Sequence, residues 1–506
     1  MRDHLARLRD AFAAAGYTTS GVDALLGPQA SAALARQETV PARRATRGRS
    51  ALDTLVRLFL LQLPVPEALL SAAVPLEEAV ALGLVELSGG EARAALDVRP
   101  YGEASEPSGT DPPLWWVVSD LGTGLDGRAR VLPEDHVLGV GGASTMLAQL
   151  TPRDPVTTTV DLGTGCGAQA LHAARHSGRV IATDVSQRAL RLAAMTAGLS
   201  QVTLDLRQGD LLSPVSGEQV ELFVSNPPFV VSPAGRPARH TYRDSGLPLD
   251  EVCARLVGEA PGLLTPGGTL VMLANWVHRA GQDWRERVGG WLPEGVDAVV
   301  VQREVLDPAE YVAMWLRDSG EDAATTYPEA YDGWLAALQD AGVAGVGLGF
   351  VTLRRTDAGT TSRLVDWPHP VQQPLGPELR DWLDRRSWLA HRDDAAVLAS
   401  TLRVGPDVSQ EQVGRPGAED PQQVVLRRAG GWRPAVRVDT ETAALVGACD
   451  GTLSAATLVD AVATVLGTDA AALRARIVGE VRDLVEDGVL LPDTRGPARA
   501  AADPPV

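Results

Sequence analysis

Two short segments of the chain combine residue types that could hold a small cofactor and a flat nitrogen group. The first segment reads DLGTGCG over residues 161–167, and the second reads NPPF over residues 226–229. Each follows an apolar run that is typical of a buried strand. Either segment alone is weak evidence for a site, because glycine-rich and proline-rich turns are common after strands. Together they predict one active site.

The first segment predicts a tight connection from a strand to a helix. Gly163, Gly165 and Gly167 permit a sharp turn and let backbone N–H groups approach a ligand without a Cβ atom in the way. We expect the helix to begin at Gly167 and to present its N-terminus to an anion such as a carboxylate. Asp161 at the end of the strand and Thr164 in the turn complete the predicted cofactor loop.

Two further acidic residues are spaced as a nucleoside site requires. Asp184 ends the next apolar run, where a carboxylate can accept hydrogen bonds from both ribose hydroxyls. Asp210 ends a third run, where it would accept from an adenine amino group with Leu211 beside the ring. The alternative for each acid is a capping role at a turn. Because the chain has no GxxxxGK[ST] loop, the pattern favours S-adenosylmethionine (SAM) over ATP.

The second segment predicts a clamp for an –NH2 group on a planar substrate. Pro227 and Pro228 stiffen the backbone and leave their carbonyl oxygens as acceptors. Asn226 adds a side-chain acceptor, and Phe229 would stack on the flat group. Amide and aryl nitrogens are poor nucleophiles, so we expect positioning and carbonyl dipoles to accelerate the reaction without a strong base. Asn226–Phe229 are therefore the predicted catalytic residues of an N-methyltransferase.

Composition favours a cytoplasmic enzyme of several domains. The chain has 506 residues, a hydrophobic fraction of 45%, a net charge of −18 and three cysteines, which give no disulfide framework. No apolar run reaches the roughly 18 residues that span a bilayer, and the N-terminus shows no secretory signal. His172 and His176 share the spacing of a metal pair, but no HExxH motif accompanies them, so no metal site is expected.

One basic segment stands apart from this acidic composition. The acidic total disfavours extended non-specific contact with nucleic acid. Within residues 36–57, however, only Glu38 and Asp53 oppose a group of arginines, which is either a solvated loop or a phosphate-binding patch. The group consists of Arg36, Arg43, Arg44, Arg47, Arg49 and Arg57.

Changes in residue pattern divide the chain into four predicted segments. Residues 1–105 are mainly helical with a Gly-Gly turn, which suggests a winged-helix-like domain, and residues 106–356 alternate apolar strands with helices as in an α/β domain. Residues 357–430 are predicted to be a connector with short elements, and residues 431–506 a second winged-helix-like domain. The predicted strands of the α/β domain are 157–162, 179–184, 203–208, 222–225, 269–274, 298–304 and 347–354.

The two motifs, with Asp184 and Asp210, resemble the class I SAM methyltransferases of the small-domain group. That group includes the HemK/PrmC-like glutamine methyltransferases, the RsmC-like rRNA guanine methyltransferases and N6-adenine methyltransferases. The resemblance covers residues 115–355 and implies a Rossmann-like, seven-stranded SAM-binding domain flanked by two small, mainly helical domains. It also implies a cofactor contact from Thr145, whereas Val230 stands where RsmC-like enzymes usually carry His.

The resemblance leaves the methyl acceptor open. A protein glutamine, in a translation factor or ribosomal protein, is the leading expectation, and an amino group on an RNA or DNA base is close behind. A SAM-binding scaffold without activity is a third alternative. The flanking segments do not resemble the usual N-terminal domain of the HemK/PrmC group, and residues 241–246 are predicted to form a mobile substrate loop.

Overall fold

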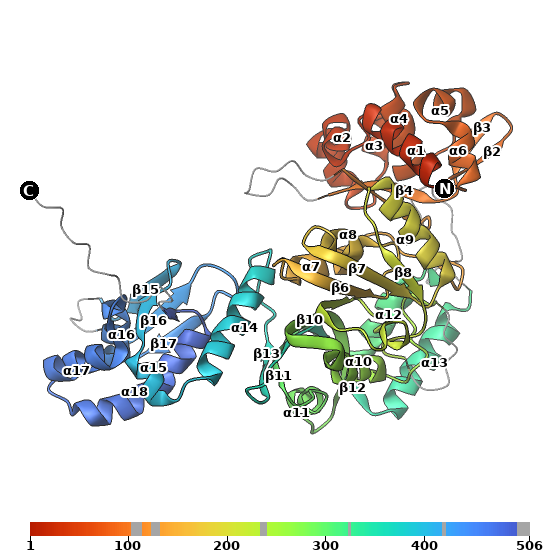
Figure 1. The fold of residues 1–506 in the computed structure, drawn as a ribbon. Helices are drawn as coiled ribbons and strands as arrows, with labels where there is room; N and C mark the ends of the chain where they lie inside the picture. Colours follow the sequence, from red (N-terminus) through yellow and green to blue (C-terminus); the bar gives the residue numbers. More distant parts are fainter. Residues whose placement is uncertain (103–113, 123–131, 233–239, 322–324, 417–420, 493–506) are drawn as a thin grey trace, which may run out of the picture. The chain divides into compact units, whose positions relative to one another are not determined.

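The computed structural model describes residues 1–102, 114–122, 132–232, 240–321, 325–416 and 421–492. These residues form two compact units (Figure 1). The first unit consists of Met1–Ala148, Arg153–Arg355 and Ser362–Pro368, and the second is built mainly from His369 onward. Among the described residues, no helix has both the length and the apolar character needed to cross a membrane.

An eight-stranded sheet forms the centre of the first unit, in the order β13-β11-β12-β10-β9-β6-β7-β8 (Figure 1). The strands from β10 to β8 run parallel, whereas β12 pairs antiparallel with β10 and β11. The bounds are β6 Val156–Leu162, β7 Ser177–Asp184, β8 Asp205–Gln208, β9 Val220–Ser225, β10 Leu264–Arg279, β11 Val296–Leu306, β12 Val343–Arg355 and β13 Thr361–Asp366.

All seven predicted strands are present, and the α/β prediction is confirmed. The structure adds β13 at the sheet edge, inside the segment predicted as a connector. Its residues are partly exposed, so the sequence lacks the apolar run that marks the other strands. β10 is also much longer than its predicted core because it continues to Arg279 along β12.

Helices cover both faces of this sheet. Successive residues of a strand point to opposite faces, so each apolar strand contributes side chains to a core on either side. Ile181 belongs to a core with α10 (Glu251–Glu259), whereas Val180 and Ala182 pack with residues of α8 (Ala168–Ala173). The remaining helices of this domain are α7 Gly142–Leu150, α9 Gln187–Leu199, α11 Trp284–Gly289, α12 Pro308–Asp318 and α13 Tyr327–Asp340.

The N-terminal part of the first unit contains a winged-helix arrangement. Its three-stranded sheet has the order β1-β3-β2, and two short helices, α5 and α6, lie between β1 and β2 in the chain. The helix α4 continues as the π-helical turn η1. The bounds are α1 Arg2–Ala14, α2 Thr19–Leu34, α3 Val40–Ala45, α4 Ala51–Leu55, η1 Val56–Leu60, β1 Val65–Pro66, α5 Glu67–Ala73, α6 Leu76–Ala81, β2 Val85–Ser88 and β3 Glu91–Ala94.

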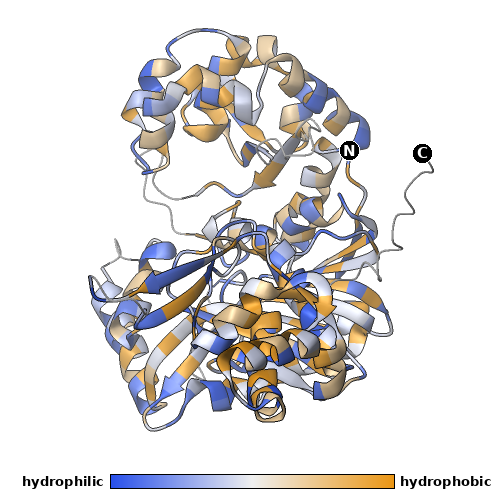
Figure 2. Cartoon of the chain, turned by 90° about the vertical axis from the view of Figure 1, so that its left-hand side faces the viewer, coloured by the Kyte–Doolittle hydropathy of each residue, from blue (hydrophilic) through white to orange (hydrophobic). Residues whose placement is uncertain are grey.

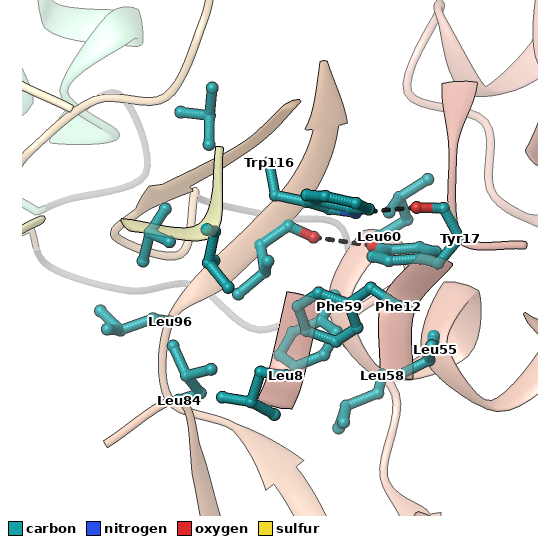
Figure 3. Packing of buried hydrophobic residues seen from close by; sticks show 14 of the residues in the cluster. Leu8, Phe12, Tyr17, Leu55, Leu58, Phe59, Leu60, Leu84, Leu96 and Trp116 are labelled. Atoms are coloured by element: carbon teal, nitrogen blue, oxygen red, sulfur yellow. Dashed lines mark hydrogen bonds between the residues drawn. The ribbon is translucent and has the colours of Figure 1, made fainter. Parts of the chain in front are cut away.

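This N-terminal part shares one core with the α/β domain. Trp116 on β5 (Trp115–Ser119) donates from Nε1 to the carbonyl of Tyr17 at 2.8 Å, and the Tyr17 hydroxyl donates to the carbonyl of Val98 on β4 (Asp97–Tyr101) at 2.7 Å (Figure 3). Trp116 is buried. A Cβ atom on Gly198 would lie 2.5 Å from a methyl group of Leu5, so this glycine allows α1 to approach α9 closely.

The second unit contains another winged-helix-like sheet, completed by a strand from outside residues 431–506. Three of its helices are α16 Thr440–Ala448, α17 Ala455–Leu466 and α18 Ala470–Glu486. Their sheet has the order β18-β14-β19, and its middle strand β14 (Thr401–Val404) comes from the predicted connector. The remaining elements are α14 Gly376–Ala390, α15 Asp394–Ala399, β15 Val408–Val413, β16 Gln423–Arg428, β17 Ala435–Val438, β18 Asp450–Ser454 and β19 Leu490–Pro492.

The compact second unit therefore begins well before the predicted boundary at residue 430. A buried ion-pair group, in which Glu378 of α14 binds Arg385 and Arg428, ties the predicted connector into this unit. In Figure 2, hydrophobic residues alternate with hydrophilic ones along the helices of the chain, as expected for helices that cover a core on one side.

Candidate active site

The sheet order brings the two sequence motifs together. β6 ends at Leu162 and β9 ends at Ser225, and these two residues are register partners in a parallel pair. The Ser225 hydroxyl donates to the carbonyl of Leu162 at 2.9 Å. A Cβ atom on Gly163 would lie 3.8 Å from the carbonyl oxygen of Asn226, so the loops after the two strands are in contact. In open α/β sheets, ligands bind at such a switch point, where neighbouring strands lead in opposite directions.

A cavity of about 370 Å³ opens at this point, within the size range of small-molecule sites. Of the residues predicted from the sequence, ten line it, whereas Asp161 and Gly167 lie behind the lining. The ten are Gly163, Thr164, Gly165, Asp184, Asp210, Leu211, Asn226, Pro227, Pro228 and Phe229. Residues 141–144, which precede β6, also line the cavity, but Thr145 does not; its hydroxyl donates to the carbonyl of Gly141.

The cofactor loop differs in one respect from the expectation that its N–H groups face a ligand. The N–H groups of Gly163 and Thr164 both donate to the carbonyl of Thr183, and that of Gly165 donates to Asp184 at 3.0 Å. The Gly167 N–H donates to the carbonyl of Thr164. These groups therefore fix the loop against the end of β7. The glycines are required for another reason: Gly163, Gly165 and Gly167 all have φ between 54° and 86°.

Asp184 joins the cofactor loop to the start of α9. One carboxylate oxygen accepts from the Gly165 N–H, and the other accepts from the Ser186 N–H at 2.8 Å. Burial raises the pKa of Asp184, and the hydrogen bonds from Ser186 and Gly165 oppose that shift. A carboxylate oxygen can accept more than one hydrogen bond, so Asp184 keeps acceptor capacity toward the cavity.

Asp161 lies beneath the loop and is almost fully buried. Its Oδ2 accepts from the Thr164 hydroxyl at 2.6 Å, whereas its Oδ1 is buried without a hydrogen-bond partner among the described residues. Burial raises the pKa of Asp161 to about 7, although the Thr164 hydrogen bond opposes this shift. A buried carboxylate with an unpaired oxygen is a fitting acceptor for a cationic donor group.

We expect Asp161→Asn to stabilise the ligand-free protein above pH 7. The folded pKa of about 7 exceeds the value of about 3.9 in unfolded chains, so the folded state binds this proton more tightly. That contribution is fully present below about pH 4 and is lost as the pH rises through 7. Because asparagine cannot ionise, the variant should gain stability over wild type between pH 4 and pH 8, on the order of 4 kcal/mol at most. Urea unfolding of both proteins at several pH values tests this, and parallel stability curves would contradict it.

The clamp presents a buried acceptor to the cavity. Asn226 Oδ1 has no hydrogen-bond partner among the described residues, and Asn226 lines the cavity. The Pro227 carbonyl is already engaged, because it accepts from the Phe229 N–H at 2.7 Å. The Phe229 ring contacts Trp315 of α12 edge-to-face, with centroids 6.2 Å apart. The Asn226 side chain is therefore the buried acceptor that the clamp leaves unsatisfied.

The far wall of the cavity contains residues that the sequence motifs did not identify. Trp315 and Asp318 come from α12, and Asp318 accepts from the Tyr242 hydroxyl at 3.3 Å. Burial raises the pKa of Asp318. His136 contacts the Tyr242 ring, and burial lowers the pKa of His136. Trp315 and Asp318 sit in an ordinary amphipathic helix far along the chain from the clamp, so no local pattern marks them.

The predicted substrate loop at residues 241–246 packs over this wall. Thr241 donates to the carbonyl of Glu134, and Phe229 forms a β-bridge with Asp244. The Arg243 side chain is only 1% exposed and donates from Nη1 to the carbonyl of Trp315 at 3.1 Å. Thr241, Tyr242 and Arg243 line the cavity, so this segment forms part of its wall, and its role as a mobile substrate loop stays a prediction.

The family comparison identifies the domain that contains this cavity. Residues 139–289 match the model described as "Methyltransferase small domain". This part of the chain belongs to the methyltransferase small domain family. Two other family models, both described as domains of unknown function, match residues 14–95 and 380–492, one on either side of the small domain.

Curated relatives of the methyltransferase small domain act on different acceptors. A release factor glutamine methyltransferase of Xylella fastidiosa is 34% identical over 30% of this chain and 66% of its own length. A ribosomal protein uL3 glutamine methyltransferase of Bradyrhizobium diazoefficiens is 32% identical over 28% of this chain and 46% of its own length. A ribosomal RNA small subunit methyltransferase C of Alcanivorax borkumensis is 33% identical over 23% of this chain and 31% of its own length. The chain thus matches less than two thirds of the length of each of these relatives.

Solved structures give a weaker likeness. The Thermus thermophilus 16S rRNA N2 G1207 methyltransferase (RsmC), in complex with AdoMet and guanosine, is 18% identical, with 46% of this chain and 60% of that chain covered and a TM-score of 0.27.

Proposed function

We propose that the small domain transfers a methyl group from SAM to a planar amide or amino nitrogen held by Asn226–Phe229. The observation that carries this proposal is the Asn226 Oδ1 atom, which is buried, unsatisfied and placed in the lining of the same cavity as Asp184. Leaving a buried acceptor unpaired costs about 1–3 kcal/mol, and an incoming N–H group would remove that cost.

The residues of the cavity fit SAM. The carboxylate of Asp184 would accept from the ribose hydroxyls, and Asp210 with Leu211 would meet the adenine. The carboxylate of Asp161 lies beneath the loop, behind the lining, where its charge would favour a cationic group in the cavity without touching it. When bound, SAM supplies an electrophilic methyl group.

The clamp residues would orient the acceptor nitrogen. By accepting a hydrogen bond from the target N–H, Asn226 Oδ1 fixes the direction of the nitrogen lone pair. Its carbonyl dipole also stabilises the positive charge that develops on the nitrogen. Phe229, held edge-on by Trp315, would stack on the flat substrate group. The nitrogen then loses its proton to solvent, so no buried strong base is needed.

We propose a protein glutamine as the leading acceptor. Two relatives are named for glutamine in a release factor and in a ribosomal protein, which supports this choice. A relative named for ribosomal RNA supports the second candidate, an amino group on a nucleic-acid base. The unsatisfied acceptor in the clamp speaks against a scaffold role, because binding SAM alone does not require it. In either case we place the enzyme in the cytoplasm with a macromolecular substrate.

Labelled SAM tests this proposal. Purified enzyme is incubated with methyl-labelled SAM and lysate of a strain that lacks the gene, and the product is treated with protease or nuclease. Label released by protease alone, with methylglutamine found by mass spectrometry, is the expected result. Label released by nuclease alone would replace glutamine with a base, and absence of macromolecular label would contradict the proposal.

A further inference from the structure

The arginine segment of the N-terminal part presents four exposed cationic side chains within a short stretch of the chain, which we together call the arginine surface. It consists of the side chains of Arg36, Arg44, Arg47 and Arg49, all exposed, at the end of α2, on α3 and in the loop before α4. None of these four side chains forms an ion pair or hydrogen bond with a described residue. In contrast, many other arginines of this acidic chain, such as Arg179, are paired with carboxylates.

The two acids within the segment do not neutralise this surface, because both stabilise helix starts. Glu38 accepts from the backbone N–H of Val40 at 2.9 Å, at the first turn of α3. Asp53 is buried and forms a capping box with Ser50 at the start of α4. Neither carboxylate forms an ion pair with one of the four arginines, and four positive charges against two negative ones leave the segment with a net positive charge.

The loop that carries Arg47 and Arg49 is fixed by its own contacts. Asp53 Oδ2 accepts from the backbone N–H of Ser50 at 3.1 Å. A Cβ atom on Gly48 would lie 2.4 Å from Asp53 Oδ2, so the loop closes directly over this carboxylate. At its start, the Thr46 hydroxyl donates to the carbonyl of Ala42 at 2.9 Å. The cationic side chains therefore extend from an ordered backbone, which lowers the entropy lost on binding a ligand.

We propose that the arginine surface binds the phosphate backbone of RNA. Guanidinium groups match phosphate oxygens with two parallel hydrogen bonds, and unpaired arginines need not break an ion pair to do so. Several such groups on one surface release counterions from a nucleic acid, which supplies most of the affinity of contacts that do not depend on sequence. The surface thus holds an RNA by its backbone, independently of the base sequence.

Duplex DNA fits the described residues less well. In a helix-turn-helix, the second helix enters the major groove. Here that helix is α6, which carries Glu77 and Glu78, and the hairpin of β2 and β3 carries Glu86 and Glu91 beside Arg93. Glu78 pairs with Arg7 and Glu91 pairs with Arg93, so two of the four glutamates are not matched by an arginine among the described residues. The surface that would face a DNA groove is therefore acidic. Short helices and loops with arginines suit the irregular backbone of folded RNA, which proteins recognise largely by shape and phosphate contacts.

A membrane surface is also a poor match. Binding in a lipid interface requires apolar side chains beside the cationic ones. Among residues 36–57, Val40 is the only large hydrophobic side chain that is strongly exposed.

The test uses the full-length protein and a fluorescein-labelled RNA hairpin in a fluorescence anisotropy titration without SAM. We expect the triple variant R44Q/R47Q/R49Q to bind the hairpin about tenfold or more weakly near 0.1 M salt. The slope of log affinity against log salt concentration should become shallower by about two. The matched control is R415Q/R433Q/R437Q, which removes three exposed arginines of the second unit and the same charge. The control should retain the affinity of wild type.

Three outcomes would overturn the proposal. The first is equal weakening in both triple variants, which would reflect net charge alone. The second is tighter binding to a DNA duplex of the same length, and the third is binding to phosphatidylserine vesicles but not to RNA. The titration contains no SAM and measures binding alone, so failure of the methylation proposal would leave this result unchanged. Thermal melting of each variant excludes a loss of fold.

Discussion

Asn226→Ala is expected to bind SAM with nearly unchanged affinity and to transfer the methyl group about a hundredfold more slowly or worse. The side chain lines the cavity at the clamp, and its buried Oδ1 atom accepts no hydrogen bond from a described residue. Removing a preorganised dipole that stabilises developing charge costs on the order of 10²–10³ in rate. Calorimetry gives the SAM affinity, and single-turnover methylation gives the rate.

The chain offers one other asparagine as a control. Asn275 on β10 is also buried, but it donates to the Tyr311 hydroxyl at 3.0 Å and does not line the cavity. Asn275→Ala should lower the thermal midpoint, because it removes one of two buried hydrogen bonds to the Tyr311 hydroxyl and leaves a cavity, and it should change the transfer rate much less. Wild-type turnover in Asn226→Ala, with SAM still bound, would remove the clamp from the reaction.

Asp184→Ala is expected to weaken SAM binding by a hundredfold or more. Two charge-assisted hydrogen bonds to ribose hydroxyls would be lost, each worth roughly 1.5–3 kcal/mol. The same carboxylate accepts from the N–H groups of Gly165 and Ser186, so the cofactor loop also loses an anchor. Calorimetric titration of SAM measures the effect.

Asp210→Ala provides the comparison for this prediction. Asp210 lines the same cavity but is exposed, and it would contribute a single hydrogen bond to the adenine. We therefore expect a smaller loss, of about tenfold. Equal losses in the two variants would indicate a general charge effect, and unchanged affinity in Asp184→Ala would place the ribose elsewhere.

The sequence predicted the parts of the site that lie next to strand ends. Gly163, Asp184 and Asn226 follow apolar runs that form β6, β7 and β9, so local patterns were sufficient to place them at one edge of the sheet. Trp315 and Asp318 reach the cavity only because α12 packs against the sheet. Such tertiary contacts leave no periodic pattern in the chain, and the same holds for the hydrogen bonds that occupy the N–H groups of the cofactor loop.

The middle strand of the C-terminal sheet has a consequence for folding during synthesis. β14 pairs with β18 on one side and with β19 on the other, although both partners follow it much later in the chain. While the chain emerges from the ribosome, both edges of β14 are unpaired until β18 has been made, and one edge stays unpaired until residues 490–492 have been made. Pairings between distant segments form slowly, and unpaired edges promote aggregation. This unit should therefore complete its fold only after residues 490–492 have emerged, and the chain should depend most on chaperones before then.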